Sequence, residues 1–152
     1  MKMPIKTLLL MLPTTIAACG ILGPNLDSEL DRQRREWDAL GRNSYSFVYR
    51  RVCFCPLPSP NAVKIVVFED LVVSVSSAST GEDVDGIKDG FWPTIDELFD
   101  FVGQAIDEDA DELIVAYHQE FFFPTLISID WIKMAIDDEI SHTASNLTSV
   151  VR

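Results

Sequence analysis

The sequence predicts an α+β fold in which an antiparallel sheet of about six strands carries two helices on one face, in the order αβββ-αβββ. Three observations support this class. Two segments place apolar residues at helical spacing, and each is followed by short segments with strand-like alternation. One pair of these short segments is separated by only two residues, which is hairpin length. The same order occurs twice, although no residue-level repeat proves a duplication.

The first helix is expected over residues 27–40, because its apolar residues recur at helical spacing while its arginines lie mostly off that stripe. The stripe consists of Leu26, Leu30, Trp37 and Leu40. Gly41 follows directly and is typical of a helix end.

Three strands are expected next, at residues 44–53, 62–68 and 71–77. In the first of them, Tyr45, Phe47 and Tyr49 fall on one face, since side chains alternate along a strand. Glu69 and Asp70 connect the second and third strands, although the glycine that favours a two-residue turn is missing.

A loop rich in glycine, aspartate and serine is expected at residues 79–90. The second helix then begins at a capping box, because Thr94 and Glu97 are spaced so that each side chain satisfies the other's free backbone donor. A broad apolar face follows. It consists of Ile95, Leu98, Phe99, Val102 and Ile106.

The last three strands are expected at residues 112–119, 125–133 and 139–148. The final strand is rich in polar residues, which predicts a place at an edge of the sheet.

Size and charge limit the classes of function. The chain has 152 residues, of which 47% are apolar, so residues 27–152 are expected to form one folded domain. The net charge is −12, and removal of Lys2 and Lys6 with residues 1–18 takes it to −14. A nucleic-acid partner is therefore not expected, because phosphate binding needs a basic surface. The acidic charge serves solubility or attracts a basic partner.

The amino terminus is predicted to be a lipoprotein signal peptide over residues 1–18. Two lysines precede a short run of leucines that is too short to span a bilayer, and small residues follow. The segment from Ile16 to Cys19 resembles the bacterial lipobox, in which the cysteine receives a diacylglycerol after cleavage. Stable anchoring needs at least two acyl chains. An ordinary signal peptide with a chance cysteine is the alternative.

Export and membrane attachment through lipid on Cys19 follow from this reading. Residues 19–26 contain Gly23 and Pro24 and are expected to form a short tether. In Gram-negative bacteria an aspartate after the lipidated cysteine commonly marks retention at the inner membrane. Gly20 lacks that mark, which favours the outer membrane, facing the periplasm, if the cell has one.

Cys53 and Cys55 form a Cys-x-Cys pair at a strand end, before Pro56. An exported protein meets an oxidising compartment, which favours a disulfide between them. Residues two apart on a strand have Cα atoms about 6.6 Å apart, at the upper edge of disulfide geometry, so the bridge needs a bend. A strained bridge used in redox chemistry and a soft-metal site completed by His118 or His142 remain alternatives.

Phe121, Phe122 and Phe123 precede Pro124 between two predicted strands. Three consecutive aromatic residues at a turn do not all reach the core easily, so this segment is a candidate partner-binding tip. The alternative is that at least two of the rings are buried against the helices.

Several motifs together resemble a family of bacterial lipoproteins of unknown function, over about residues 30–150. They are Tyr45-x-Phe47-x-Tyr49, Cys53-Phe54-Cys55-Pro56, Thr94 to Phe99, Pro124 with Ile129-Asp130, and Asp137-Asp138-Glu139. The sequence departs from the pattern at Phe121 to Phe123, where a more polar turn is usual, and at Glu69-Asp70. The resemblance implies a location and a coherent fold, and it implies no mechanism.

No nucleophile or acid pattern accompanies His118 or His142, so no enzyme activity and no cofactor are expected. The sequence therefore predicts a non-enzymatic binding or structural module of the cell envelope, with a protein of the envelope as its partner. A metal-binding or thiol-redox module at Cys53 and Cys55 is the alternative.

Overall fold

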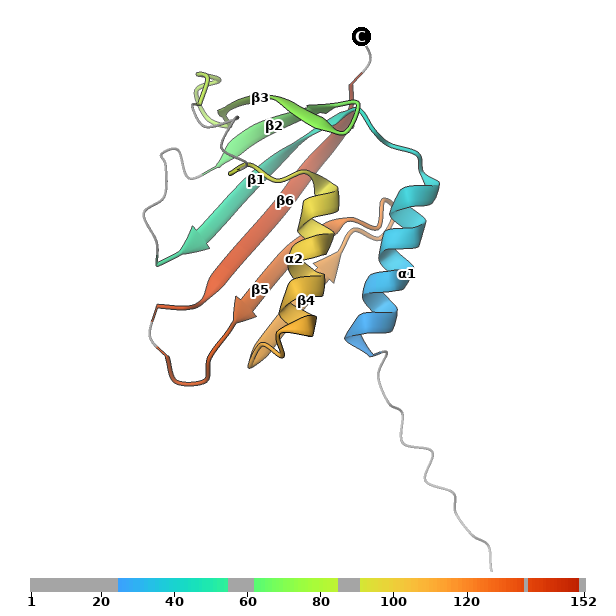
Figure 1. Ribbon diagram of the computed structural model, residues 1–152. Coiled ribbons are helices and arrows are strands. Elements are labelled where there is room, and N and C mark those ends of the chain that lie inside the picture. The colour runs from blue at the N-terminus through green and yellow to red at the C-terminus, as the bar shows by residue number, and fades with distance from the viewer. Residues whose placement is uncertain (1–24, 55–61, 85–90, 136, 151–152) are drawn as a thin grey trace, which may run out of the picture.

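The computed structural model describes residues 25–54, 62–84, 91–135 and 137–150 (Figure 1). It confirms the predicted α+β class, the two helices, the six-stranded antiparallel sheet and the order of the elements. The elements are α1 (Leu26–Ala39), β1 (Tyr45–Cys53), β2 (Val63–Phe68), β3 (Leu71–Ser77), α2 (Ile95–Asp107), β4 (Glu112–Tyr117), β5 (Pro124–Asp130) and β6 (Ile140–Ser149).

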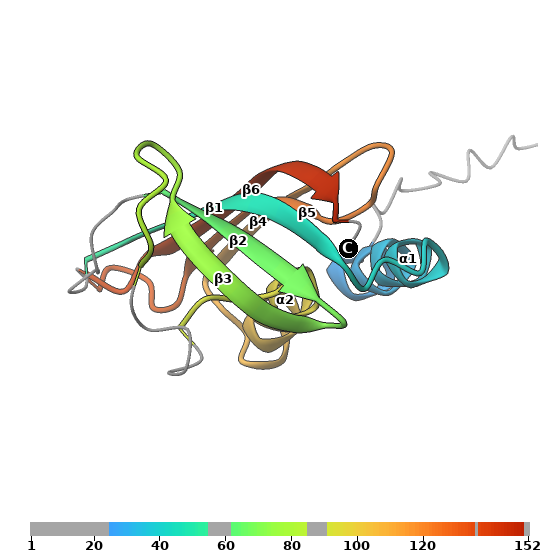
Figure 2. The ribbon, with the colours of Figure 1, turned by 90° about the horizontal axis from the view of Figure 1, so that it is seen from above.

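The strands lie in the order β3-β2-β1-β6-β5-β4, so each half of the chain forms its own three-stranded meander. The two meanders join at the centre of the sheet, where β1 pairs with β6, as seen from above in Figure 2. The prediction that the last strand is an edge strand is therefore wrong. Its buried positions, His142 and Ala144, alternate with Ser141 and Thr143, and hydroxyl side chains suit the face that no helix covers.

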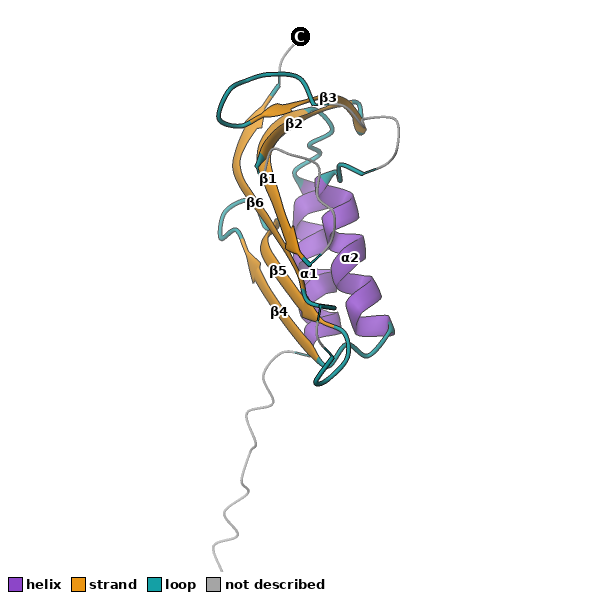
Figure 3. Cartoon of the chain, turned by 90° about the vertical axis from the view of Figure 1, so that its left-hand side faces the viewer, coloured by secondary structure: helices purple, strands orange, loops and turns teal. Residues whose placement is uncertain are grey.

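Both helices cover one face of the sheet and leave the other face open (Figure 3). The predicted alternation of β1 is confirmed, because Tyr45, Phe47 and Tyr49 are all buried beneath the helices. Trp37 of α1 packs edge-on against Tyr45, with 5.5 Å between ring centroids. Edge-to-face aromatic pairs of this kind stabilise a core beyond the area that they bury.

The apolar stripe predicted for α1 is only partly correct. Trp37 is buried and Leu30 is half-buried, but Leu26 and Leu40 are exposed, and Gln33 is buried in their place. The reason is geometric, since Leu26 is the first residue of the helix and Leu40 its C-cap, whereas Gln33 and Trp37 lie one turn apart on the same face.

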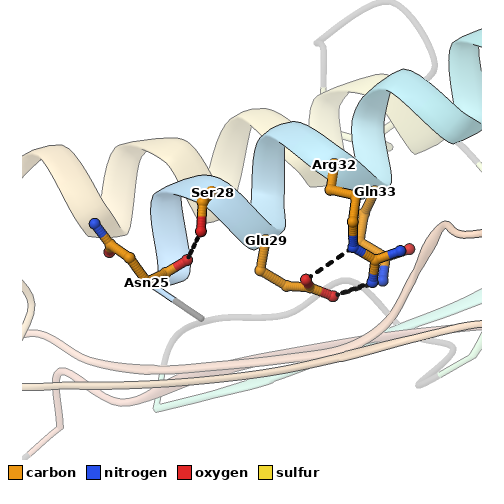
Figure 4. A network of polar contacts seen from close by, with 5 residues as sticks. All are labelled: Asn25, Ser28, Glu29, Arg32 and Gln33. Atoms are coloured by element: carbon orange, nitrogen blue, oxygen red, sulfur yellow. Dashed lines mark hydrogen bonds and ion pairs between the residues drawn. The ribbon is translucent and has the colours of Figure 1, made fainter. Parts of the chain in front are cut away.

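Polar contacts define the start of α1. Asn25 caps the helix, and its carbonyl accepts a hydrogen bond from the hydroxyl of Ser28 (Figure 4). Glu29 accepts hydrogen bonds from Arg32 and Gln33. The Arg32 bond first, and the Gln33 bond second, hold the pKa of Glu29 below its ordinary value. The first turn of α1 is therefore well defined at the point where the preceding chain enters the domain.

The predicted capping box of α2 is confirmed. The Thr94 hydroxyl accepts from the Glu97 amide at 3.2 Å, and the Glu97 carboxylate accepts from the Thr94 amide at 2.7 Å. The hydroxyl of Tyr45 accepts a further hydrogen bond from the amide of Ile95 at 3.1 Å. These bonds satisfy orphan donors of the first helical turn and tie α2 directly to β1.

The Glu69-Asp70 hairpin forms as predicted, and β2 and β3 pair across it. Both residues adopt left-handed backbone angles, with φ of 50° and 65°. A two-residue turn that matches the twist of the strands requires such angles, which glycine and asparagine adopt at lower cost. Residues 79–84 belong to the predicted loop, whose remaining residues lie outside the described ranges.

Candidate functional site

A cavity of about 540 Å³ lies where β1 ends and β6 begins; we refer to it as the sheet-end cavity. It is lined by Val52, Cys53, Phe54, Ser128, Ala135, Asp137, Glu139, Ile140 and Ser141. These residues come from three neighbouring strands and from the connection between β5 and β6 (Figure 1). The cavity is therefore built jointly by the central strand pair and one long connection.

The floor of the sheet-end cavity is formed by residues that pair across three neighbouring strands. Ser141 pairs with Val52 on one side and with Ser128 on the other, so the three residues form a row across three strands. This row belongs to the sheet face that the helices leave open. The floor therefore offers two hydroxyl groups, each able to donate and accept, beside one exposed apolar side chain.

The wall formed by the β5–β6 connection is acidic. Asp137 and Glu139 line the sheet-end cavity, and both are exposed. Asp138 lies between them and has a different role, because its carboxylate accepts a 2.7 Å hydrogen bond from the amide of Ile132. The acidic motif thus divides into one residue that shapes the connection and two exposed carboxylates that line the cavity.

Large apolar side chains are exposed around the same region. Phe54 is 79% exposed and belongs to the wall of the sheet-end cavity. Ile132 and Met134 are 63% and 91% exposed and belong to the turn that begins the β5–β6 connection. Exposed apolar side chains that gather in one patch commonly mark a contact site, so this end of the sheet is a candidate contact surface.

A buried polar pair lies on the helix-covered face of the same strands. The Tyr49 hydroxyl and His142 Nδ1 are 2.7 Å apart, and both residues are buried. Burial first, and the Arg51 charge second, lower the pKa of His142 to about 4, so the ring is neutral at pH 7. The Tyr49 hydroxyl therefore donates to His142. Burial also raises the pKa of Tyr49.

Aromatic rings enclose this pair. Phe101 of α2 stacks on His142, with 4.8 Å between ring centroids. The Arg51 guanidinium lies 3.9 Å from the centroid of Phe91, and Phe91 in turn packs edge-on against Trp92. No hydrogen-bond partner of His142 was predicted from the sequence. Its partner is Tyr49 of β1. Alternation along each strand could place both residues on a buried face, but the pairing of β1 with β6 that brings them together was not predicted.

Cys53 lines the sheet-end cavity and is half-buried, whereas Cys55 lies outside the described residues, so the disulfide between them stays a prediction. Both histidines proposed to complete a metal site have other partners at Nδ1. His118 accepts from the amides of Glu120 and Phe121, and His142 accepts from Tyr49. Within the described parts of the chain, no three acidic, cysteine or histidine side chains converge on a common ion position.

The three phenylalanines before Pro124 have different environments. Phe123 is 1% exposed and packs against Trp37 in the core, so it is not available as part of a partner-binding tip, and that assignment is corrected for this residue. Phe121 is half-buried between His118 and Arg42, whose guanidinium lies 4.7 Å from its ring centroid. Phe122 is half-buried with φ of 64°. The turn therefore sends one ring into the core and leaves the other two half-buried.

Cys19 and the rest of the predicted signal peptide and tether up to residue 24 lie outside the described residues. Among the helices that the structure describes, none has the length and apolar character needed to cross a bilayer.

The model of a family of unknown function (DUF6174) matches residues 29–149. No curated protein and no solved structure is similar enough to count as a match.

Proposed function

The chain belongs to this family of unknown function (DUF6174), and we propose that it is an exported envelope protein held at a membrane by lipid on Cys19. Its domain serves as a non-enzymatic binding or structural module, and the sheet-end cavity is the part that contacts a partner. The proposal favours the outer membrane, with the domain facing the periplasm, in a cell that has two membranes.

The segment from Lys2 to Cys19 is the observation that carries the anchoring proposal. A positively charged start, a short apolar run and small residues directly before a cysteine suit export, cleavage and lipid attachment in that order. Asn25, the N-cap of helix α1, follows only a few residues later. A diacylglycerol with a further acyl chain supplies the two or more chains that stable anchoring requires.

The sheet-end cavity supports a binding role. It combines two exposed apolar side chains, those of Val52 and Phe54, with two carboxylates and two hydroxyl groups. Asp137 and Glu139 favour a basic group on the partner, and the net charge of −12 strengthens that preference at long range. The partner that fits is an envelope protein segment that presents a lysine or arginine beside an apolar side chain.

Fatty-acid labelling and cell fractionation test the anchoring. Wild type incorporates labelled palmitate and remains with the membranes after a high-salt wash, whereas Cys19→Ser incorporates none and is recovered in the soluble fraction. A Cys19→Ser variant that stays equally firmly with the membranes contradicts the proposal.

Cross-linking in intact cells tests the binding role. A photoreactive residue in place of Phe54 should capture one reproducible envelope protein, and Asp137→Asn with Glu139→Gln should weaken that capture. Val73→Ser, an exposed apolar position on β3, serves as a matched control and should leave the capture unchanged. Absence of any reproducible partner contradicts the binding role and leaves the anchoring intact.

A thiol-redox module at Cys53 and Cys55 is the second candidate function, favoured by the position of Cys53 in the wall of an open cavity. Metal binding is the weaker form of this candidate. Nδ1 accepts hydrogen bonds in both His118 and His142, which places the ring proton on Nε2 and leaves neither nitrogen with a free lone pair for a metal. The mass of the purified protein should rise by about 2 Da on reduction if the cysteines are bridged. A retained metal mass would instead indicate a site, and freely reactive thiols without metal would exclude both forms.

A further inference from the structure

The turn that begins the β5–β6 connection holds apolar side chains out from the domain; we refer to residues 131–135 as the loop tip. The amide of Ala135 donates to the carbonyl of Ile132 at 2.9 Å, which closes the turn. Asp138 accepts from the amide of Ile132 at 2.7 Å and ties the turn to the following chain. Met134 is 91% exposed, with φ of 63°. These bonds fix the backbone of the turn from which the exposed side chains project.

The loop tip lies at the same end of the domain as the start of α1. Figures 1 and 3, taken from perpendicular directions, both place the β5–β6 connection and the first turn of α1 at the lower end of the molecule. The chain between the proposed lipid on Cys19 and the helix cap at Asn25 spans at most about 20 Å when extended. The tether thus keeps this end of the domain, and the loop tip with it, close to the membrane surface.

We propose that the loop tip inserts into the head-group region of the same bilayer that holds the lipid on Cys19. This inference rests on the anchoring proposed above. The composition of the tip suits such a layer. Trp131 is half-buried, Ile132 and Met134 offer apolar side chains, and Lys133 carries its charge on a long apolar stem that reaches back to the head groups. Insertion gives the domain a second contact with the membrane and a fixed orientation.

The charges around the loop tip define the kind of lipid surface. Helix α2 ends at the same lower end of the domain (Figure 3). Exposed acidic residues stand at its last position and directly after it, at Asp107, Glu108 and Asp109, and Asp137 follows the tip. Anionic lipid would repel these groups, so the tip suits a zwitterionic surface such as phosphatidylethanolamine. Attraction of charges cannot drive the contact, and burial of apolar side chains must do so.

Tryptophan quenching in reconstituted vesicles tests the insertion. The mature, lipidated protein is placed in phosphatidylethanolamine–phosphatidylcholine vesicles, either ordinary or with bromine near the head-group end of the acyl chains. Of the three tryptophans, Trp37 and Trp92 are buried in the domain, so Trp131 is the one that bromine can reach. Emission should fall measurably in brominated vesicles, by up to about a third because one of three tryptophans is reached, and Trp131→Phe should show no fall.

Matched variants distinguish insertion of the loop tip from nonspecific adsorption of exposed apolar side chains to the vesicles. Ile132→Ser with Met134→Ser removes two exposed apolar side chains of the tip and should abolish most of the quenching, since Trp131 then leaves the head-group layer. Leu71→Ser with Val73→Ser removes two comparably exposed side chains on β3 and should leave the quenching unchanged. Vesicles rich in anionic lipid should give weaker quenching than zwitterionic ones.

The outcomes distinguish this inference from the anchoring itself. A protein that floats with the vesicles through its lipid, while Trp131 remains unquenched, overturns the insertion and leaves the anchoring standing. Quenching that persists in the Ile132→Ser, Met134→Ser variant also overturns it. A mature protein without lipid on Cys19 overturns both proposals. A loop tip that is shielded from water-soluble labelling reagents in cells, while Trp131 is not quenched in purified vesicles, would assign the tip to a protein partner instead.

Discussion

The hydroxyl of Tyr49 donates a 2.7 Å hydrogen bond to Nδ1 of His142 across the central strand pair of the sheet. Both residues are buried on the helix-covered face, where an unpaired polar group is costly. The pair therefore requires a neutral imidazole, and burial provides it by lowering the pKa of His142 to about 4. Two halves of the chain, one strand from each meander, are joined by this bond.

Removal of the Tyr49 hydroxyl should destabilise the domain. Tyr49→Phe keeps the ring contact with Trp92 but leaves Nδ1 of His142 without its donor. The free energy of unfolding in urea should fall by about 1–3 kcal/mol, the cost of a buried acceptor left unsatisfied. A double-mutant cycle with His142→Phe measures the coupling, and additive effects of the two changes would contradict the bond.

Stability should depend on pH through His142. Its folded pKa, about 4, lies below the unfolded value of about 6.5, so the unfolded chain binds the proton first as pH falls. Neutral His142 thus contributes fully to the free energy of unfolding above pH 6.5. About 3 kcal/mol of that free energy is lost as the pH falls from 6.5 to 4. His142→Gln retains an acceptor for Tyr49 and cannot titrate. The difference in unfolding free energy between wild type and His142→Gln should narrow as the pH falls from 6.5 to 4. A difference that stays constant would contradict a neutral, buried His142.

Substitution of neighbouring phenylalanines in the turn before Pro124 should destabilise the domain to very different extents. Phe123 is buried against Trp37, so Phe123→Ala should reduce the free energy of unfolding by about 3–5 kcal/mol. Phe121→Ala removes a half-buried ring that contacts Arg42 and should cost clearly less. Equal losses, measured by chemical denaturation, would mean that the turn is packed differently.

A better turn sequence between β2 and β3 should stabilise the domain. Glu69 and Asp70 both have positive φ, which costs non-glycine residues conformational energy. Asn-Gly suits the turn better, so replacing the pair should raise the free energy of unfolding by about 0.5–1 kcal/mol. Thermal unfolding provides the measurement, and a destabilised variant would show that the native side chains make contacts that the turn needs.

The fold was largely predictable because its elements are signalled locally. The Thr94–Glu97 capping box and the β1 alternation depend only on residues close in the sequence, and both are confirmed. The central position of β6 was missed because strand order depends on long-range pairing. A strand that is polar on one face and bears His142 and Ala144 on the other resembles an edge strand in composition alone.

The candidate site was less predictable for the same reason. Cys53 and the acidic motif were recognised as separate features, but register and the β5–β6 connection bring Cys53, Asp137 and Glu139 to one cavity. The exposure of Ile132 and Met134 could not be foreseen, since the strand was expected to continue through residue 133. It ends at Asp130, and a turn closed by Ala135 follows.

The amino terminus of the protein extracted from membranes is the most direct test of the account. Mass spectrometry of the first proteolytic peptide should show a chain that begins at Cys19 and carries a thioether-linked diacylglycerol on its sulfur. A chain that begins at any other residue, or a Cys19 without lipid, would contradict the anchoring from which the membrane proposals follow.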